Sequence, residues 1–223
     1  MNITLETDFP VALDSPDHLH PWGTLQDNAI GSEHYQGEGA KLMLDELYSY
    51  FGEQSISIMD LGCSGGQFTI DALNRGWLAV GLEGSDYSIV HHRAAWPEYH
   101  NKNLFTCDCS KPFQVLIDGE PAQFDCITTF EFLEHLHPDT LDTLFDNVCK
   151  HLTPNGIFCG QYSIGPDSGN PRDKFPLHQT IQGAGWWNKK FSEYFNIVED
   201  YPFKGCLRIL YGSSIRYLCK NKK

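Results

Sequence analysis

A glycine-rich segment holds the first residues whose types and spacing suit chemistry: Asp60-Leu61-Gly62-Cys63-Ser64-Gly65-Gly66. It lies between a stretch that predicts a strand and one that predicts a helix, and acidic Glu83 ends the next predicted strand. Glycines let the backbone turn sharply and approach a ligand, and the start of a helix offers free N–H groups. A carboxylate after the second strand can accept hydrogen bonds from both ribose hydroxyls. The arrangement predicts a nucleoside-binding site.

A second group of polar residues follows a later apolar run, in Phe130-Glu131-Phe132-Leu133-Glu134-His135-Leu136. On a helical turn Glu131, Glu134 and His135 stand at i, i+3 and i+4, so their side chains would share one face. Such a face could hold a divalent metal, and a histidine ligand would favour manganese, iron or a mixed site over magnesium. The metal-free alternative is that the glutamate lines a ligand pocket and the histidine caps a helix.

A third candidate is His178, in the segment 163–185, which is rich in proline and glycine and predicts a long irregular loop. Trp186 and Trp187 follow it. An imidazole titrates near neutrality, so His178 could act as a general base that removes a hydroxyl proton. The alternative is a structural loop histidine bonded to the backbone.

The elements that must position these residues alternate between strand and helix. We expect helices at residues 36–51, 67–75, 86–96, 138–152 and 186–194, a turn at 154–156, and strands at 55–60, 77–83, 103–107, 124–129, 157–162, 195–199 and 206–219. This alternation predicts an α/β fold with a doubly wound, mostly parallel seven-stranded sheet, helices on both faces and a C-terminal antiparallel hairpin.

The chain of 223 residues suits one such domain, which we place at residues 36–223. Residues 1–35 carry three prolines and no sustained periodicity, which predicts an irregular arm that could cover a site. Polar and aromatic residues of this arm are candidates for contact with a ligand, or are simply solvated: His18, His20, Trp22, Asp27, Asn28 and His34.

Composition excludes several function classes. The chain has 16 Lys and Arg against 29 Asp and Glu, and the net charge of −13 disfavours nucleic acid as a partner. No run approaches the roughly 18 apolar residues that a membrane span needs, and the first residues lack the features of a secretory signal, so we expect a cytoplasmic protein. The eight cysteines show no C-x-x-C spacing, which predicts reduced core thiols. Oligomeric state cannot be read from the sequence.

The segment from Asp60 to Gly66 resembles the first motif of class I S-adenosylmethionine-dependent methyltransferases, which reads acidic-x-Gly-x-Gly-x-Gly. Here Ser64 stands at the middle glycine, and neighbouring Gly65 can compensate. A dehydrogenase fingerprint would need G-x-G-x-x-G, a spacing that Gly62, Gly65 and Gly66 do not give. The resemblance covers most of the chain and implies S-adenosylmethionine as cofactor.

The resemblance also implies roles for individual residues. Asp60 and the Gly62 backbone would lie near the amino-acid end of the cofactor, with Cys63 and Gly66 in the same turn, and Glu83 would bind the ribose hydroxyls. Gly84 and Ser85 would border the adenine, and Asp108 would accept the adenine amino hydrogen. Glu131 would line the cofactor pocket, and the N-terminal arm would fold over the cofactor as a lid. Asp60 and Asp108 could instead merely cap turns.

The implied reaction is transfer of the sulfonium methyl group to a nucleophile, and we expect a hydroxyl on a small-molecule or carbohydrate-like acceptor, with His178 and His135 as the catalytic residues and no metal. The segment around His178 resembles one in small-molecule and sugar methyltransferases. The rival is a metal-assisted O-methyltransferase, because the Glu-x-x-Glu-His spacing is similar to the metal site of ubiquinone-pathway and small-RNA 2′-O-methyltransferases. A further alternative is a catalytically silent binding subunit that retains the fold.

Overall fold

The structure is a computed structural model that describes residues 1–15, 37–166, 176–199, 202–203 and 214–222. Its centre is a seven-stranded sheet in the order β4-β3-β2-β7-β8-β10-β9, in which only the pairings of β10 are antiparallel. In that order the strands are Leu104–Thr106, Leu78–Glu83, Ser57–Leu61, Phe124–Phe130, Leu152–Ser163, Ser214–Asn221 and Phe195–Ile197. The predicted doubly wound sheet and C-terminal antiparallel hairpin are confirmed.

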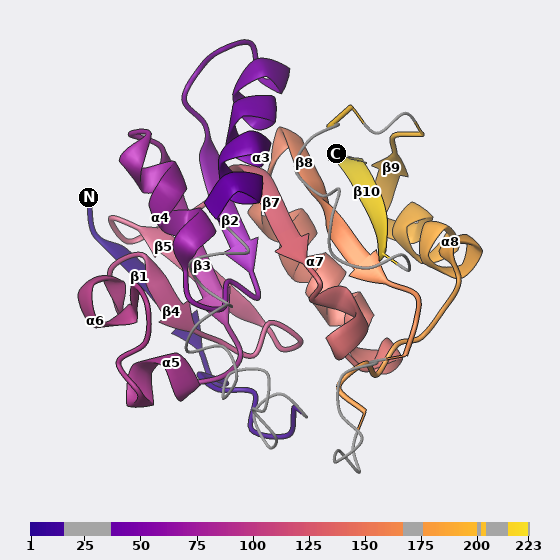
Figure 1. Ribbon diagram of the computed structural model, residues 1–223, viewed down its shortest axis with the longest axis horizontal. Coiled ribbons are helices and arrows are strands. Elements are labelled where there is room, and N and C mark those ends of the chain that lie inside the picture. Colours follow the sequence, from indigo (N-terminus) through magenta and orange to yellow (C-terminus); the bar gives the residue numbers. More distant parts are fainter. Residues whose placement is uncertain (16–36, 167–175, 200–201, 204–213, 223) are drawn as a thin grey trace.

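Helices cover both faces of this sheet (Figure 1). The α-helices are α3 (Gly37–Tyr50), α4 (Gln67–Asn74), α5 (Tyr87–Val90), α6 (Trp96–Tyr99), α7 (Leu141–His151) and α8 (Ala184–Tyr194). Side chains alternate along a strand, so the sheet contributes to two separate cores. Ile58 of β2 packs in the cluster that holds α3 and α4, and its neighbour Met59 packs in the cluster that holds α7 and α8.

A small antiparallel sheet has the order β1-β5-β6. Strands β5 and β6 belong to the connection between β4 and β7, and β1 comes from the N-terminal end of the chain. Its strands are β1 (Ile3–Thr7), β5 (Phe113–Ile117) and β6 (Glu120–Pro121). The prediction of an irregular arm is therefore wrong at its start, because residues 3–7 find a partner strand that lies more than 100 residues later. The arm residues from His18 to His34 that the sequence singled out lie outside the described residues.

Two predicted helices differ from the observed ones for local reasons. The helix expected over residues 86–96 is two short helices, α5 and α6, because His92 and Ala94 adopt left-handed backbone angles that no helix can pass through. The helix expected from residue 138 starts as a 3₁₀ turn, η2 (Pro138–Thr140), before α7. The turn expected at 154–156 falls within β8, where pairing with β7 shifts register between Leu152 and Ile157.

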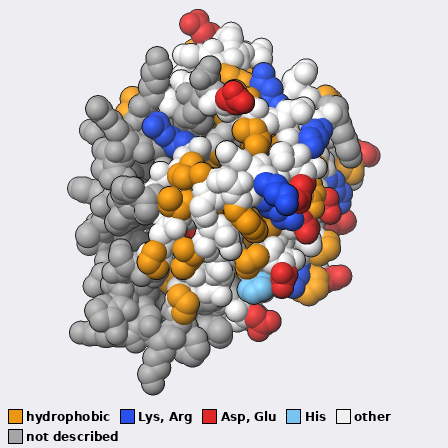
Figure 2. Space-filling model, turned by 90° about the vertical axis from the view of Figure 1, so that its right-hand side faces the viewer, with side chains coloured by type: hydrophobic (Ala, Val, Ile, Leu, Met, Phe, Trp, Pro, Cys, Tyr) orange, Lys and Arg blue, Asp and Glu red, His pale blue; other side chains and the backbone are white. Residues whose placement is uncertain are grey.

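The seven cysteines within the described residues are all free thiols, as the sequence predicts. Cys126 and Cys159 lie on the neighbouring strands β7 and β8, and their buried Sγ atoms are 3.7 Å apart. No helix among the described residues is both long and apolar enough to span a membrane. On the side of the molecule where α8 lies, basic and acidic side chains are interspersed rather than gathered by sign (Figure 2).

Candidate active site

The carboxyl ends of β2, β3, β4, β7 and β8 meet at one edge of the sheet, because these strands are parallel. Ligands of open α/β sheets bind outside this edge. The residues that the sequence singled out lie along it in two groups. One group follows β2, β3 and β4, and we call it the donor side. The other follows β7 and β8, and we call it the acceptor side.

The glycine-rich turn after β2 begins the donor side. Its left-handed residues are Gly62 (φ 75°), Ser64 (φ 48°) and Gly66 (φ 85°). Backbone N–H groups of Gly62 and Cys63 both donate to the Leu82 carbonyl of β3, at 2.8 and 3.0 Å. A Cβ on Gly62 would lie 2.5 Å from the Phe132 ring, so only glycine satisfies both the backbone angle and the space.

Cys63 and Gly66 support the turn rather than expose a reactive group. Cys63 is buried, and burial raises the pKa of its thiol well above the ordinary value, so it carries no thiolate. A Cβ on Gly66 would lie 2.6 Å from the Leu104 side chain of β4. Both residues can therefore reach a ligand only through their backbone.

Glu83, at the end of β3, directs its carboxylate toward the glycine-rich turn. Its Oε2 accepts a hydrogen bond from the Ser64 N–H at 2.8 Å, and its Oε1 accepts one from the Ser85 N–H at 3.1 Å. A carboxylate oxygen can accept a second hydrogen bond. The side chain is thus held in place by two backbone groups and retains the capacity to accept hydrogen bonds from a diol.

Asp60, the fourth residue of β2, is a buried carboxyl group with 3% of its surface exposed. Burial raises its pKa to about 7, the hydrogen bond from the Thr128 hydroxyl (2.7 Å) opposes that shift, and the charge of Glu83 adds to it. A buried carboxyl with a pKa near neutrality would be driven to its ionised form by a cationic ligand. Asp60 therefore suits an ammonium group at this end of the donor side.

Gly84, Ser85 and Asp108 lie side by side, since β3 and β4 pair in parallel and the Cys107 N–H donates to the Glu83 carbonyl at 2.9 Å. Asp108 Oδ1 accepts hydrogen bonds from the Ser110 N–H (3.0 Å) and the Ser110 hydroxyl (2.6 Å). Asp108 thus caps its own turn, as the sequence analysis allowed. Both bonds use Oδ1, so contact between this carboxylate and an adenine stays a prediction.

The acceptor side departs from the helical turn that the sequence predicts. Strand β7 continues through Phe130, Glu131 has a left-handed φ of 51°, and only η1 (Leu133–His135) forms a 3₁₀ turn. The expectation that Glu131, Glu134 and His135 share one helical face is wrong, because Glu131 has a left-handed backbone and lies outside the short η1 turn. A glutamate in this conformation is strained, and such strain clusters at functional sites.

Glu134 is fully buried at the centre of the acceptor side. Its Oε1 accepts a hydrogen bond from the Ser163 N–H of β8 at 2.9 Å, while its Oε2 has no hydrogen-bond partner among the described residues. Burial raises the pKa of Glu134 to about 8; the charge of His135 opposes this shift and the nearby Glu131 carboxylate adds to it. A buried carboxyl oxygen without a partner is costly and marks a candidate functional group.

His178 lies beside Glu134 because the two residues that follow it bond to the Glu134 backbone. The backbone N–H groups of Gln179 and Thr180 both donate to the Glu134 carbonyl, at 2.7 and 2.9 Å. The Thr180 hydroxyl donates to the Leu136 carbonyl at 2.6 Å. Sequence reasoning missed Gln179 and Thr180, because no motif marks a backbone contact between residues so far apart in the chain.

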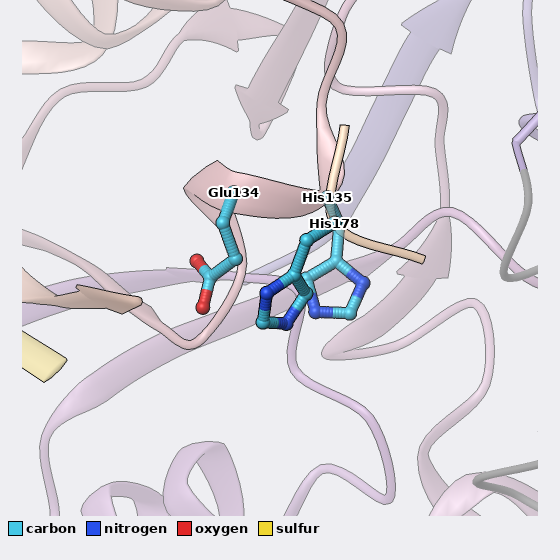
Figure 3. A group of neighbouring side chains, drawn as sticks. All are labelled: Glu134, His135 and His178. Carbon is cyan, nitrogen blue, oxygen red and sulfur yellow. The ribbon is translucent and has the colours of Figure 1, made fainter. Parts of the chain in front are cut away.

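The three side chains Glu134, His135 and His178 form a compact cluster (Figure 3). One ligand atom from each lies within 4.8 Å of the others. The rings of His135 and His178 meet edge to face, with centroids 5.0 Å apart. Glu131 is outside this cluster, and the described residues contain no other group of three such side chains.

The tautomer of His178 follows from its hydrogen bond to the backbone. Its Nδ1 lies 2.8 Å from the Gly165 carbonyl oxygen, which can only accept, so Nδ1 carries the proton. In the neutral ring Nε2 then holds a lone pair and can accept a proton or bind a metal. By contrast, Trp187 is fully buried against Tyr162 and Phe191 and belongs to the core.

Phe132 joins the two sides of the site. Its ring packs on Gly62 of the donor turn, and its carbonyl accepts the His135 N–H at 3.0 Å. Sequence analysis assigned Phe132 no role, and no local pattern signals this contact. Phe132 therefore connects the donor turn to the segment that carries His135.

Comparison with known proteins bears on the family and the fold of the chain. Residues 59–158 match the family model described as "Methyltransferase domain". Over 99 residues the chain is 29% identical to a ubiquinone biosynthesis O-methyltransferase from Idiomarina loihiensis, a match that covers 44% of this chain. The matched part spans only 39% of that relative's length.

Solved structures share the fold at low sequence identity. An S-adenosylmethionine-dependent methyltransferase from Clostridium acetobutylicum superposes with a TM-score of 0.63 at 14% identity, covering 91% of this chain and 98% of that one. N-methyltransferase NodS from Bradyrhizobium japonicum, in complex with S-adenosyl-L-homocysteine, gives 0.55 at 15% identity over 91% and 98% of the two chains. The chain shares its fold with these methyltransferases, and the family match covers residues 59–158. The domain bounds of 36–223 stay a prediction.

Proposed function

We propose that this methyltransferase domain makes the protein an S-adenosylmethionine-dependent methyltransferase that methylates a hydroxyl of a small-molecule or carbohydrate-like acceptor. The observation that carries the proposal is the shared sheet edge, where Phe132 links a nucleoside-type donor turn to a cluster of two histidines. Neighbours of the same fold bind S-adenosyl-L-homocysteine, and the matched relative from Idiomarina is named as an O-methyltransferase. Both support this assignment.

The donor side fits the chemical groups of the cofactor from one end to the other. Asp60 is a buried carboxyl suited to the amino-acid ammonium, and it stands directly before the left-handed glycine-rich turn. The fixed carboxylate of Glu83 suits the ribose diol, and Gly84, Ser85 and Asp108 would border the adenine. S-adenosylmethionine supplies an electrophilic methyl group, and these residues orient it.

The acceptor side supplies a base close to that methyl group. Neutral His178, with its proton on Nδ1, presents Nε2 to accept the hydroxyl proton as the oxygen becomes a nucleophile. His135 packs against the His178 ring and restrains it. The net charge of −13 argues against a polyanionic acceptor, so a small uncharged or carbohydrate-like hydroxyl compound fits better.

A second candidate is metal-assisted O-methylation, and one observation favours it. Glu134, His135 and His178 place an oxygen and two nitrogens within 4.8 Å of one another, and Glu134 Oε2 is buried without a partner among the described residues. This mixed donor set fits a divalent transition metal better than magnesium. Such an ion would supply Lewis acidity that lowers the pKa of an acceptor hydroxyl. The sequence hypothesis also included Glu131, but Glu131 is not among these three candidate metal ligands.

The proposed reaction is tested by incubating the protein with S-adenosylmethionine that carries a deuterated methyl group and a panel of catechols, phenols and sugars. We expect a mass increase on a hydroxyl compound that His178→Ala abolishes and His137→Ala preserves; His137 is an exposed histidine outside the cluster. Transfer only to amines would overturn the hydroxyl assignment. Cofactor binding without transfer to any acceptor would favour the catalytically silent subunit.

The role of a metal is tested separately from turnover. Protein treated with chelator is titrated with manganese(II) and followed by electron paramagnetic resonance, alongside His178→Ala and His137→Ala. Binding that His178→Ala removes and His137→Ala keeps would establish the metal-assisted route. Absence of binding, together with turnover that survives chelation, would leave His178 as a metal-free base.

A further inference from the structure

Ser64 occupies a strained position in the glycine-rich turn. Its φ of 48° lies in the left-handed region. A side chain makes this conformation costly, because Cβ crowds the backbone, whereas glycine adopts it freely. The first motif of the methyltransferases that the chain resembles has a glycine at this position, and this chain has a serine. A contact that holds Ser64 in this conformation would offset the cost.

Two side chains form hydrogen bonds with the backbone of Ser64. Its N–H donates to Glu83 Oε2 at 2.8 Å, and its carbonyl accepts a hydrogen bond from the indole Nε1–H of Trp96 at 2.7 Å. The indole nitrogen can only donate, so the direction of this second bond is fixed. The neighbouring Ala95 N–H donates to the Gly65 carbonyl at 3.2 Å. Residues 95–96 thus bond two successive carbonyls of the turn.

The packing around Trp96 fixes its position beside the turn. Its side chain is 1% exposed and packs in a small core cluster with Cys63 of the turn and Leu104 of β4. The chain reaches Trp96 through His92 and Ala94, whose left-handed φ angles are 51° and 47°. Such angles at residues other than glycine persist only where the surrounding structure fixes them. Two strained residues therefore precede α6 and bring the indole N–H to the turn.

We infer that Trp96 is a positioning residue of the methyl-donor site. Its indole N–H holds Ser64 in the left-handed conformation, in which the Ser64 N–H bonds Glu83 and keeps that carboxylate directed toward the turn. The inference rests on the proposed function, because it assumes a ribose at Glu83. Trp96 acts through Ser64 and Glu83, and it compensates for the missing middle glycine, a role that the sequence alone assigns to neighbouring Gly65.

Calorimetric titration with S-adenosyl-L-homocysteine tests the inference through Trp96→Phe, which keeps an aromatic ring and removes the N–H. Without the bond, only a fraction of the molecules hold Ser64 in the binding conformation, and the apparent dissociation constant rises by the inverse of that fraction. The loss of one hydrogen bond of this kind corresponds to a rise of about fivefold. The matched control is Trp77→Phe, because Trp77 is also buried but packs in the cluster that holds α3 and α4. This control should leave the affinity unchanged.

The change Ser64→Gly separates this positioning role from a structural one. Glycine adopts the left-handed conformation without the indole bond, so Trp96→Phe should weaken the affinity by less than about twofold when Ser64→Gly is also present. A purely structural role of Trp96 in the core predicts an equal loss in both backgrounds. Such an equal loss, or an affinity of Trp96→Phe equal to that of Trp77→Phe, would overturn the inference.

A second variant tests the same bond even where Trp96→Phe fails to fold. Replacement of Trp96 by 3-benzothienylalanine keeps the shape of the indole and puts sulfur in place of the N–H. We expect the same rise in the dissociation constant, about fivefold. Unchanged affinity would overturn the inference and leave the proposed function standing. Absence of S-adenosyl-L-homocysteine binding by the natural protein would overturn both.

Discussion

The donor and acceptor sides of the site lie at one sheet edge but are built in different ways. On the donor side, the hydrogen bonds of Glu83 to Ser64 and Ser85, and those of Gly62 and Cys63 to Leu82, lie within one strand-helix-strand unit. On the acceptor side, Glu134 is held by Ser163 and by Gln179 and Thr180, across separations of up to 46 residues. A local unit can bind a common cofactor, whereas loops from distant parts of the chain can vary the acceptor pocket independently.

If this division is correct, a change on one side should alter one property and leave the other intact. We therefore measure cofactor affinity to detect a change on the donor side and turnover to detect a change on the acceptor side.

The largest effect is expected for His178→Ala on the acceptor side. Loss of a general base or a metal ligand should lower kcat by about 10²- to 10⁴-fold, because proton transfer contributes that much to catalysis. Affinity for S-adenosyl-L-homocysteine should stay unchanged, since the contacts of His178 within the described residues are with Gly165 and His135 on the acceptor side. Turnover is measured with the acceptor identified from the panel. A parallel loss of cofactor affinity would show that the two sides are not separable.

Glu83→Ala should have the reverse effect on the donor side. It removes the acceptor for the ribose diol and also leaves the Ser64 and Ser85 N–H groups without the bonds that they now make. Hydrogen bonds to charged groups contribute about 1.5–3 kcal/mol each, so the dissociation constant should rise by about 10²-fold or more. Calorimetric titration with S-adenosyl-L-homocysteine measures this, with Glu120→Ala on the exposed strand β6 as control. Unchanged affinity would contradict the ribose assignment.

The raised pKa of Asp60, a donor-side residue, predicts that the stability of the folded protein depends on pH. Burial raises the pKa of Asp60 in the folded protein to about 7 from the ordinary value of 3.8, so the folded state holds the proton more tightly. Stability is therefore lost as pH rises from about 4 to about 7, by linkage, and stays low above that. Asp60→Asn cannot ionise, and its stability advantage over the natural protein should be about 2–3 kcal/mol greater at pH 8 than at pH 5.

Chemical denaturation of both proteins at the two pH values measures that difference. Because the other carboxyl groups remain in both proteins, their contributions cancel in the comparison. A stability difference that does not change with pH would contradict the raised pKa of Asp60.

The smallest effect is expected for Thr180→Val, which preserves shape and the backbone bond to Glu134 but removes the hydroxyl bond to Leu136. A lost hydrogen bond of this kind costs about 1 kcal/mol of stability. Turnover should fall by less than about tenfold, since a net bond energy of that size corresponds to about a factor of five. Thermal denaturation and turnover are compared with Thr4→Val, an exposed threonine of β1. A fall in turnover as large as that of His178→Ala would assign Thr180 a direct catalytic role.

Much of the donor side could be predicted from the sequence, because the signals are local. Gly62 and Gly66 do adopt left-handed backbone angles, and Glu83 does face the turn that Gly62 begins. The seven-stranded sheet follows from the alternation of short apolar strands and amphipathic helices. Whether each donor residue contacts the cofactor stays a prediction.

The acceptor side was predicted less well for a physical reason. Helical spacing grouped Glu131 with Glu134 and His135. The left-handed backbone of Glu131 and the bonds of Gln179 and Thr180 to Glu134 decide instead which side chains meet. Strand β1 was missed for the same reason, since its partner β5 is distant in sequence and its alternation is only five residues long. Contacts between distant segments leave no periodic signal in a single sequence.

A crystal structure of the protein with S-adenosyl-L-homocysteine is the most direct test of the claim that a cofactor site and a histidine cluster share one edge of the sheet. We expect the ribose hydroxyls within hydrogen-bond distance of Glu83, the adenine between Gly84 and Asp108, and the sulfur on the side of Phe132 that leads to His178. Binding at any other place, or with the sulfur directed away from the histidines, would contradict it.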